Sequence, residues 1–140
     1  MTREEIVDLF DRRTKAFNDR NIAAFASVYA EDAVVESPLG GTHQGRAAIG
    51  AVIEGLRDAL NDATWAEDDL IIDGDHVVQV CTFSGTDTGG LMGMTPSGRP
   101  AQFPVVFVCR VADGSITHER RIYDFTGMLV QIGVLKAKPA

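Results

Sequence analysis

The chain has 140 residues, of which 45% are hydrophobic and 24% charged, and its formal net charge at pH 7 is -7. This length suits a single domain with a real core, and the composition is that of an ordinary soluble globular protein. The negative charge opposes binding to the phosphate backbone of nucleic acids. No apolar run approaches the ~20 residues that span a bilayer, and no basic-then-apolar signal segment precedes the first helical pattern. We therefore expect neither a nucleic-acid nor a membrane partner.

The first part of the chain is predicted to be helical. Apolar side chains recur at helical spacing over residues 3–18, and Asn21 is an N-cap candidate for a second helix that continues to Tyr29. A third helix with an apolar stripe is expected over about residues 46–60.

The rest of the chain alternates as strands do. The Asp113-Gly114 pair between two alternating runs is typical of a hairpin turn. We expect strands over residues 33–36, 64–72 and 76–86 and on both sides of that turn, a loop over 39–42, and a terminal helical turn over 126–134. Helices followed by an antiparallel sheet indicate an α+β fold, and we expect one domain over residues 1–140.

The two cysteines, Cys81 and Cys109, both lie in strand-like runs. Cysteines in such positions are typically small buried hydrophobes, so we do not expect a disulfide between them. This expectation fits a reducing, cytoplasmic compartment.

Arg13 lies on the apolar face of the first helix, between Phe10 and Phe17. An unpaired guanidinium cannot be buried without a large cost in free energy. Arg13 therefore either pairs with a carboxylate in a structural ion pair, reaches out to solvent, or borders a wet cavity.

The last predicted strand is unusually rich in charge. Because side chains alternate across a strand, one face is expected to carry Thr117, Glu119, Arg121 and Tyr123, and the other Ile116, His118, Arg120, Ile122 and Asp124. Two interpretations remain open. The strand is a solvent-exposed edge, or one face lines a polar ligand pocket while the other packs against a second subunit.

Several motifs along almost the whole chain are similar to those of a known family. They lie at residues 16–18, 29–34, 45–49, 89–96, 110–114 and 124–127, followed by Leu129, Gln131 and Gly133. On these motifs the chain resembles the nuclear transport factor 2-like superfamily and, within it, the SnoaL-like polyketide cyclases. The resemblance implies a cone: a curved, mostly antiparallel sheet wrapped around helices, open at one end, and a homodimer formed through the sheet. Arg13 and the Arg121 face would then point toward the cavity.

The catalytic residues of similar families are replaced in this chain. Where SnoaL-like cyclases place an acid/base Asp and a pocket His, this sequence has Arg121 and Phe107. Where ketosteroid isomerases place their base and a Tyr donor, it has Ser37 and Arg13. Aldol cyclisation and steroid isomerisation by the mechanisms of those families are therefore not predicted.

The remaining candidates form a cationic site. Arg13 and Arg121 would together make a positive pocket that stabilises a carboxylate, phenolate or enolate. Glu119 is either a general base or the counter-ion of Arg121, with the counter-ion role favoured. Tyr123 is either an oxyanion donor or a core residue. We assign a catalytic role to Glu119, Arg121 and Tyr123. The predicted substrate-binding residues are Arg13, Phe17, Tyr29, Ser37, Trp65, Met92 and Phe107.

The three histidines show no metal-ligand spacing with each other or with the cysteines. We expect no metal and no cofactor. The favoured function is an enzyme that isomerises, cyclises, dehydrates or, without a cofactor, oxygenates a hydrophobic, oxygenated small molecule. The alternatives are a non-catalytic binding module and a protein–protein adaptor, and fold alone does not decide between them.

Overall fold

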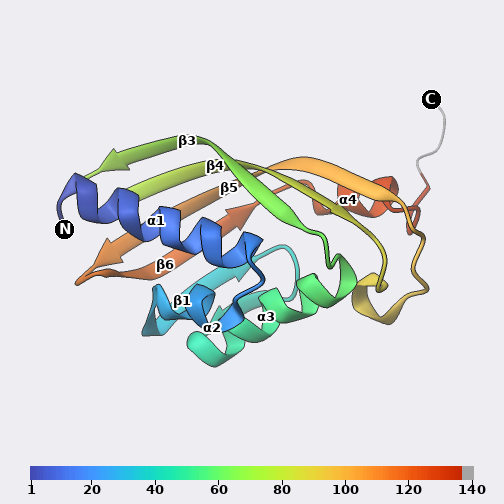
Figure 1. Cartoon of the computed structure of the whole chain (residues 1–140), viewed down its shortest axis with the longest axis horizontal. Coiled ribbons are helices and arrows are strands. Elements are labelled where there is room, and N and C mark those ends of the chain that lie inside the picture. Colours follow the sequence, from blue (N-terminus) through green and yellow to red (C-terminus); the bar gives the residue numbers. More distant parts are fainter. Residues whose placement is uncertain (137–140) are drawn as a thin grey trace.

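Three helices lie against one face of a single six-stranded sheet (Figure 1) in the computed structural model, which describes residues 1–136. The last four residues of the predicted domain lie outside the described range. The elements are α1 (Arg3–Asn18), α2 (Ile22–Ser27), β1 (Tyr29–Ser37), β2 (Gly41–Gln44), α3 (Arg46–Ala59), β3 (Thr64–Asp73), β4 (His76–Thr86), the short 3-10 helix η1 (Leu91–Gly93), β5 (Pro100–Ala112), β6 (Ser115–Ile122) and α4 (Phe125–Gln131).

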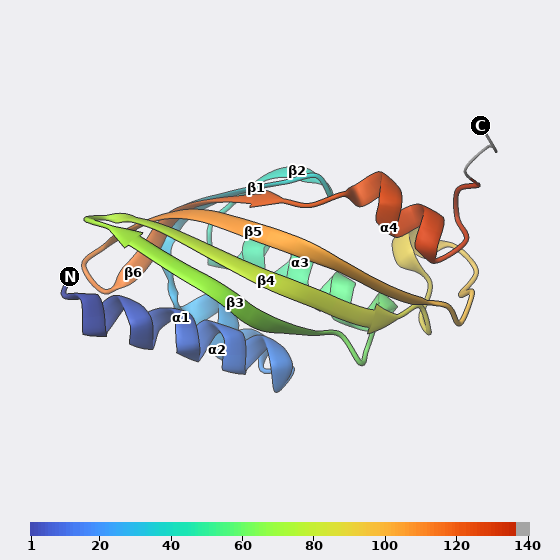
Figure 2. The ribbon, with the colours of Figure 1, turned by 90° about the horizontal axis from the view of Figure 1, so that it is seen from above.

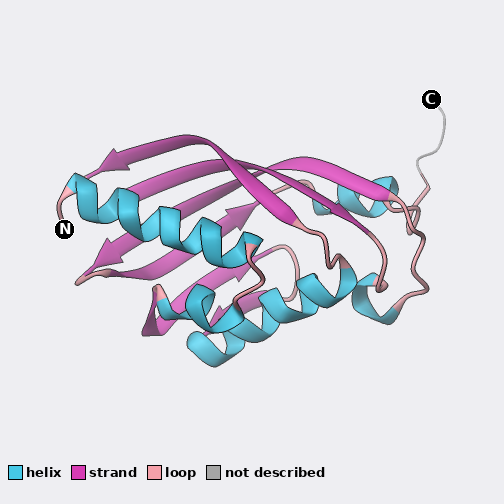
Figure 3. Cartoon of the chain, in the orientation of Figure 1, coloured by secondary structure: helices cyan, strands magenta, loops and turns pink. Residues whose placement is uncertain are grey.

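The strand order is β2-β1-β6-β5-β4-β3, and every neighbouring pair is antiparallel except β1 with β6, which is parallel. Figure 2 shows the sheet curving above α1, α2 and α3, with α4 at the end opposite the N-terminus. Figure 3 separates the helical layer from the strand layer in the view of Figure 1. The predicted α+β fold with a curved, mostly antiparallel sheet is confirmed.

Two boundaries in the first half of the chain were predicted wrongly. The Asn21 side chain does cap α2 by accepting a hydrogen bond from the backbone N–H of Ala24 at 3.0 Å. The helix ends at Ser27, however, and Tyr29 begins β1, which is longer than the expected strand over 33–36. The backbone of Val28 already pairs with β6, through a 2.9 Å hydrogen bond from Ile116, so long-range pairing overrides local helical preference.

The expected loop over 39–42 is also partly strand. Gly40 and Gly41 both adopt a φ of +78°, which a tight turn requires and which glycine adopts readily. The turn folds β2 back antiparallel on β1, pairing Ser37 with Gly41 and Val34 with Gln44. This hairpin positions Leu39 beside the candidate site.

A bulge at Thr117 breaks the simple alternation expected for β6. Arg110 pairs with His118 while Val111 pairs with Ile116, so Thr117 has no partner on β5. The side chains of Ile116 and Glu119 were predicted to lie on different faces of β6. This prediction is wrong, because the extra residue in the bulge turns both side chains to the buried, concave face. Arg121 shares that face as expected.

The aromatic core joins α1 to the sheet. The rings of Phe17 and Trp65 are stacked with their centroids 3.8 Å apart and their planes 9° from parallel. Phe25 and Phe83 contact this pair, with ring centroids 5.9 Å apart for Phe25 and Trp65 and 6.4 Å apart for Phe83 and Phe17, separations that are typical of aromatic clusters. The stack fixes the position of α1 against β3.

Gly89 lies where the loop after β4 crosses the end of α3. Its N–H donates to the carbonyl oxygen of Ala59 at 2.8 Å, and a Cβ added there would lie 2.0 Å from the carbonyl oxygen of Asp58. We expect Gly89→Ala to destabilise the protein by about 1–3 kcal/mol, because the backbone must move apart. Urea unfolding measures this change.

The matched control for Gly89→Ala is Gly55→Ala. Gly55 is exposed in α3, and an added Cβ there meets no atom within 4 Å, so helix propensity should make this change stabilising by up to about 1 kcal/mol. A Gly89→Ala protein as stable as wild type would show that the loop does not need this close approach.

Candidate active site

A buried ionic network connects α1 to the concave face of the sheet. The carboxylate of Glu119 accepts hydrogen bonds from Arg13 Nη1, from Arg121 Nε at 2.6 Å and from the Tyr29 hydroxyl at 3.0 Å. Arg13 Nη2 also donates to Gln79 Oε1 at 2.7 Å. Arg13 and Glu119 are both fully buried, so Arg13 pairs with a carboxylate, one of the outcomes that its position on the apolar face predicted.

The charges of this network fix its protonation. Burial alone would raise the pKa of Glu119, but the positive charges of Arg13 and Arg121 outweigh burial and lower it from 4.5 to about 2. Burial alone would lower the pKa of Arg13, but the carboxylate of Glu119 raises it instead. At neutral pH the network therefore holds two guanidinium cations and one carboxylate. Its net charge is one positive, enclosed in a largely apolar interior.

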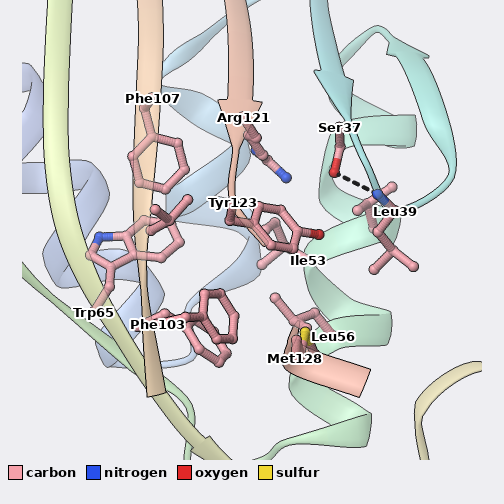
Figure 4. A pocket seen from close by; sticks show the side chains of 13 residues that line it. Ser37, Leu39, Ile53, Leu56, Trp65, Phe103, Phe107, Arg121, Tyr123 and Met128 are labelled. Carbon is pink, nitrogen blue, oxygen red and sulfur yellow. Dashed lines mark hydrogen bonds between the residues drawn. The ribbon is translucent and has the colours of Figure 1, made fainter. Parts of the chain in front are cut away.

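A cavity opens beside this network, between α3, the sheet and α4 (Figure 4). Its walls are mainly aromatic and aliphatic, and Ser37, Tyr123 and Arg121 add polar groups. The aromatic side chains are Trp65, Phe83, Phe103, Phe107 and Tyr123, and the aliphatic ones are Leu39, Val52, Ile53, Leu56, Val105 and Met128. The cavity has a volume of about 40 Å³. Small organic ligands occupy pockets of about 300–1,000 Å³, so side chains must move for one to enter.

Arg121 brings the only charge among the described residues that line this cavity. Its side chain is 7% exposed, and Figure 4 shows it reaching toward the cavity between Phe107 and Tyr123. Nε is bonded to Glu119, and Nη2 lies 3.4 Å from the Tyr29 hydroxyl. Within residues 1–136, Nη1 has no hydrogen-bond acceptor, so this donor is available to a ligand.

Tyr123 and Ser37 are the neutral polar groups of the cavity. Burial raises the pKa of Tyr123 above its ordinary value, although contacts with Ser37, the charge of Arg121 and the Leu39 backbone oppose this. Tyr123 is therefore a neutral hydroxyl at physiological pH. Such a hydroxyl can donate a hydrogen bond to an anionic oxygen without itself carrying charge.

A model of the SnoaL-like polyketide cyclase family matches residues 8–132 of the chain. The chain belongs to the SnoaL-like polyketide cyclase family. The resemblance expected from the sequence motifs is confirmed. No curated protein matches the chain at a significant level.

Solved structures share the fold of this SnoaL-like protein. AclR of Streptomyces galilaeus, a candidate hydroxylase, is 22% identical to this chain with a TM-score of 0.85. The match covers 99% of this chain and 87% of AclR. A protein of Catenulispora acidiphila with a ketosteroid isomerase-like fold is 20% identical with a TM-score of 0.80, covering 94% and 97%. IdmH of Streptomyces antibioticus, a candidate polyketide cyclase, is 28% identical with a TM-score of 0.78, covering 91% and 97%.

The residues predicted for the site divide into two groups. Arg121, Tyr123, Ser37, Trp65 and Phe107 line the cavity. The other five lie elsewhere: Glu119, Arg13, Tyr29 and Phe17 are buried behind the cavity wall, and Met92 is 57% exposed outside it.

Some residues of the network and cavity were not anticipated. Gln79 is fully buried, and its amide N–H donates to Glu67 at 3.0 Å and to Thr14 at 3.2 Å. Its position at an inward site of an otherwise apolar strand was an available signal. Met128 of α4 closes one side of the cavity, and nothing in the sequence near it pointed there.

Over residues 1–136, no group of three or more His, Cys, Asp or Glu side chains is placed to hold a metal ion. Cys81 and Cys109 are buried free thiols. In the same range, no helix is both long and apolar enough to cross a membrane.

Proposed function

We propose that this SnoaL-like protein is an enzyme that binds a hydrophobic, oxygenated small molecule as its phenolate or enolate and isomerises or cyclises it. The observation that carries the proposal is the Arg121 guanidinium, which faces an apolar cavity with Nη1 free of any acceptor in the described chain. A cation in such surroundings attracts an anionic oxygen far more strongly than it would in water.

Glu119 is a positioning residue in this proposal. It does not line the cavity, and its pKa of about 2 makes it a weak proton acceptor at neutral pH. Its bond to Arg121 Nε orients the guanidinium so that Nη1 faces the ligand. Tyr123 supplies a second, neutral donor to the same oxygen.

The cavity wall supplies no general base among its described residues, since it carries neither a carboxylate nor a histidine. The substrate must therefore be acidic enough to ionise when Arg121 stabilises its anion. Enols of 1,3-dicarbonyl compounds and hydroxylated aromatic rings meet this requirement. Membership of a polyketide cyclase family and the likeness to IdmH support this substrate class.

The same absence of a base favours a second candidate function, a non-catalytic module that binds such anions. Deuterium exchange at the acidic carbon of a cyclic 1,3-diketone, followed by NMR, separates the two functions. An enzyme accelerates the exchange in proportion to its concentration, whereas a binding module only binds the anion.

The test of anion binding uses 4-nitrophenol, whose phenol and phenolate forms absorb at different wavelengths. We expect binding to wild type to lower the pKa of the ligand by about one unit or more, a preference for phenolate of about tenfold or more. Arg121→Gln should weaken phenolate binding about 10–100-fold, because a hydrogen bond to a charged group contributes about 1.5–3 kcal/mol.

Arg120→Gln is the matched control, since Arg120 directly precedes Arg121 in β6 and is exposed on the opposite face. It removes the same charge from the chain without touching the cavity, so phenolate binding should be unchanged. Equal effects of the two substitutions, or tighter binding of the neutral phenol, would contradict the proposal.

The homodimer also remains a proposal. The convex face of the sheet carries paired apolar residues, with Val78 opposite Val108 and Val106 opposite Ile122. Ile122 is 47% exposed and Ile71 57% exposed. A second chain packed on this face would cover them. A cytoplasmic location likewise remains a prediction.

A further inference from the structure

A second concavity lies directly outside the cavity. It is a groove between the β1–β2 turn, α3 and η1. It has a volume of about 230 Å³, against about 40 Å³ for the cavity. The cavity and the groove share the side chains of Leu39, Val52 and Leu56. These three half-buried apolar side chains therefore border both spaces.

The groove is built to receive apolar material. His43 contributes its only ionisable group within the described chain, and His43 Nε2 lies 3.2 Å from the carbonyl oxygen of Leu39, which holds the β1–β2 turn in place. Gly55 leaves the floor on α3 open, because a Cβ there would meet no atom within 4 Å. Met92 forms part of the outer wall and is 57% exposed, and methionine adapts readily to the shape of a ligand.

The cavity and the groove together fit one kind of molecule. The cavity is too narrow as it stands to enclose a large ligand, and the junction with the groove offers no polar group to a ligand. Rotation of Leu39 and Leu56 about their side-chain bonds would join the two spaces, and such rotations occur readily in partly exposed residues.

We propose that the groove is a subsite for a hydrocarbon arm of the ligand whose ionised ring lies at Arg121. The substrate is then an amphipathic molecule with an acidic, oxygenated ring system and an apolar substituent. This inference rests on the proposed function, because it takes the anionic ring to be held in the cavity.

The test compares 2-hydroxy-1,4-naphthoquinone with its 3-octyl homologue by fluorescence or calorimetric titration at a pH where both are ionised. We expect the octyl homologue to bind wild type at least tenfold more tightly, because its chain leaves water for the groove. Gly55→Leu should weaken binding of the octyl homologue about tenfold and leave binding of the parent compound unchanged. Ala47 is exposed on the same helix and does not line the groove. Ala47→Leu should therefore leave the affinity for both compounds unchanged.

The outcomes separate the subsite from the proposed function. If Gly55→Leu weakens the binding of both ligands equally, or changes the binding of neither ligand, the subsite proposal is overturned. If Arg121→Gln weakens binding of the parent compound but wild type shows no preference for the octyl homologue, the cavity proposal stands and the subsite falls. If wild type binds neither ligand, both proposals fall.

Discussion

Replacing Glu119 with Gln is expected to lower the free energy of unfolding by about 3–5 kcal/mol, the cost of leaving a buried charge without its partner. The substitution removes the only carboxylate that contacts Arg13 in the described chain, and Arg13 is fully buried. It also removes the counter-charge of Arg121. A Gln side chain has nearly the shape of Glu, so the loss is one of charge and not of packing. Urea unfolding at pH 7 measures it.

Glu36→Gln is the matched control, because it makes the same chemical change on a carboxylate that contacts a basic side chain at the surface. Glu36 lies on the convex face of β1, the strand next to β6. Its carboxylate is 3.0 Å from Nε2 of His118 in β6, and the Glu36 side chain is 49% exposed. An exposed pair contributes at most about 1 kcal/mol. A Glu119→Gln protein no less stable than Glu36→Gln would show that the network does not need its carboxylate.

The positioning role of Glu119 needs a readout that stability does not supply. Where Glu119→Gln is still folded, its preference for the phenolate form of 4-nitrophenol should fall, because the carboxylate that orients Arg121 through Nε is lost. A rise in this preference, which the added net positive charge alone would give, would contradict the positioning role. In the double variant Arg13→Met with Glu119→Gln, the loss of unfolding free energy should be smaller than the sum of the losses in the two single variants, since the two side chains contact each other.

The sequence predicted the helices and most strands because their patterns are local. Arg13 stood out because a guanidinium on an apolar helix face demands a partner, and Glu119 and Arg121 because charges are rare in a strand that helps bury a core. The length of β1 was missed because it depends on pairing with β6, and the face of Ile116 was missed because the bulge at Thr117 arises only when β5 and β6 pair.

The composition of the cavity could be predicted only in part, for a related reason. Its lining residues come from five strands, from α3 and α4, and from the connections that hold Leu39 and Tyr123. A periodic pattern gives which face of an element is buried but not which elements meet there. Phe107 was found because similar cyclases place a pocket His at its position, and Trp65 because an aromatic residue at the start of a strand can cap a pocket mouth, whereas Met92 lies outside the cavity, in the groove. Arg121 belongs both to the cavity wall and to the ionic network.

Acid should remove the contribution of Glu119 to stability between pH 4.5 and about 2. Its pKa is lower in the folded protein than its ordinary value, so the contribution is fully present above pH 4.5 and is lost as the pH falls through about 2. A pKa lowered from 4.5 to about 2 corresponds to about 3 kcal/mol. Asp62, whose pKa is lowered mainly by hydrogen bonding to Thr86, acts in the same direction, so the wild-type curve alone does not isolate Glu119.

The contribution of Glu119 is isolated by comparing the unfolding free energy of wild type and of Glu119→Gln across pH. We expect the gap in unfolding free energy between wild type and Glu119→Gln to be constant above pH 5 and to narrow steadily toward pH 2, because only wild type can take up a proton at this position. The gap between wild type and Glu36→Gln should stay small throughout. Parallel curves for wild type and Glu119→Gln down to pH 2 would mean that Glu119 has the same pKa in the folded and unfolded chain. Two guanidinium groups in hydrogen-bond contact with a fully buried carboxylate do not permit that result, so it would contradict the network itself and with it the orientation of Arg121 toward the cavity.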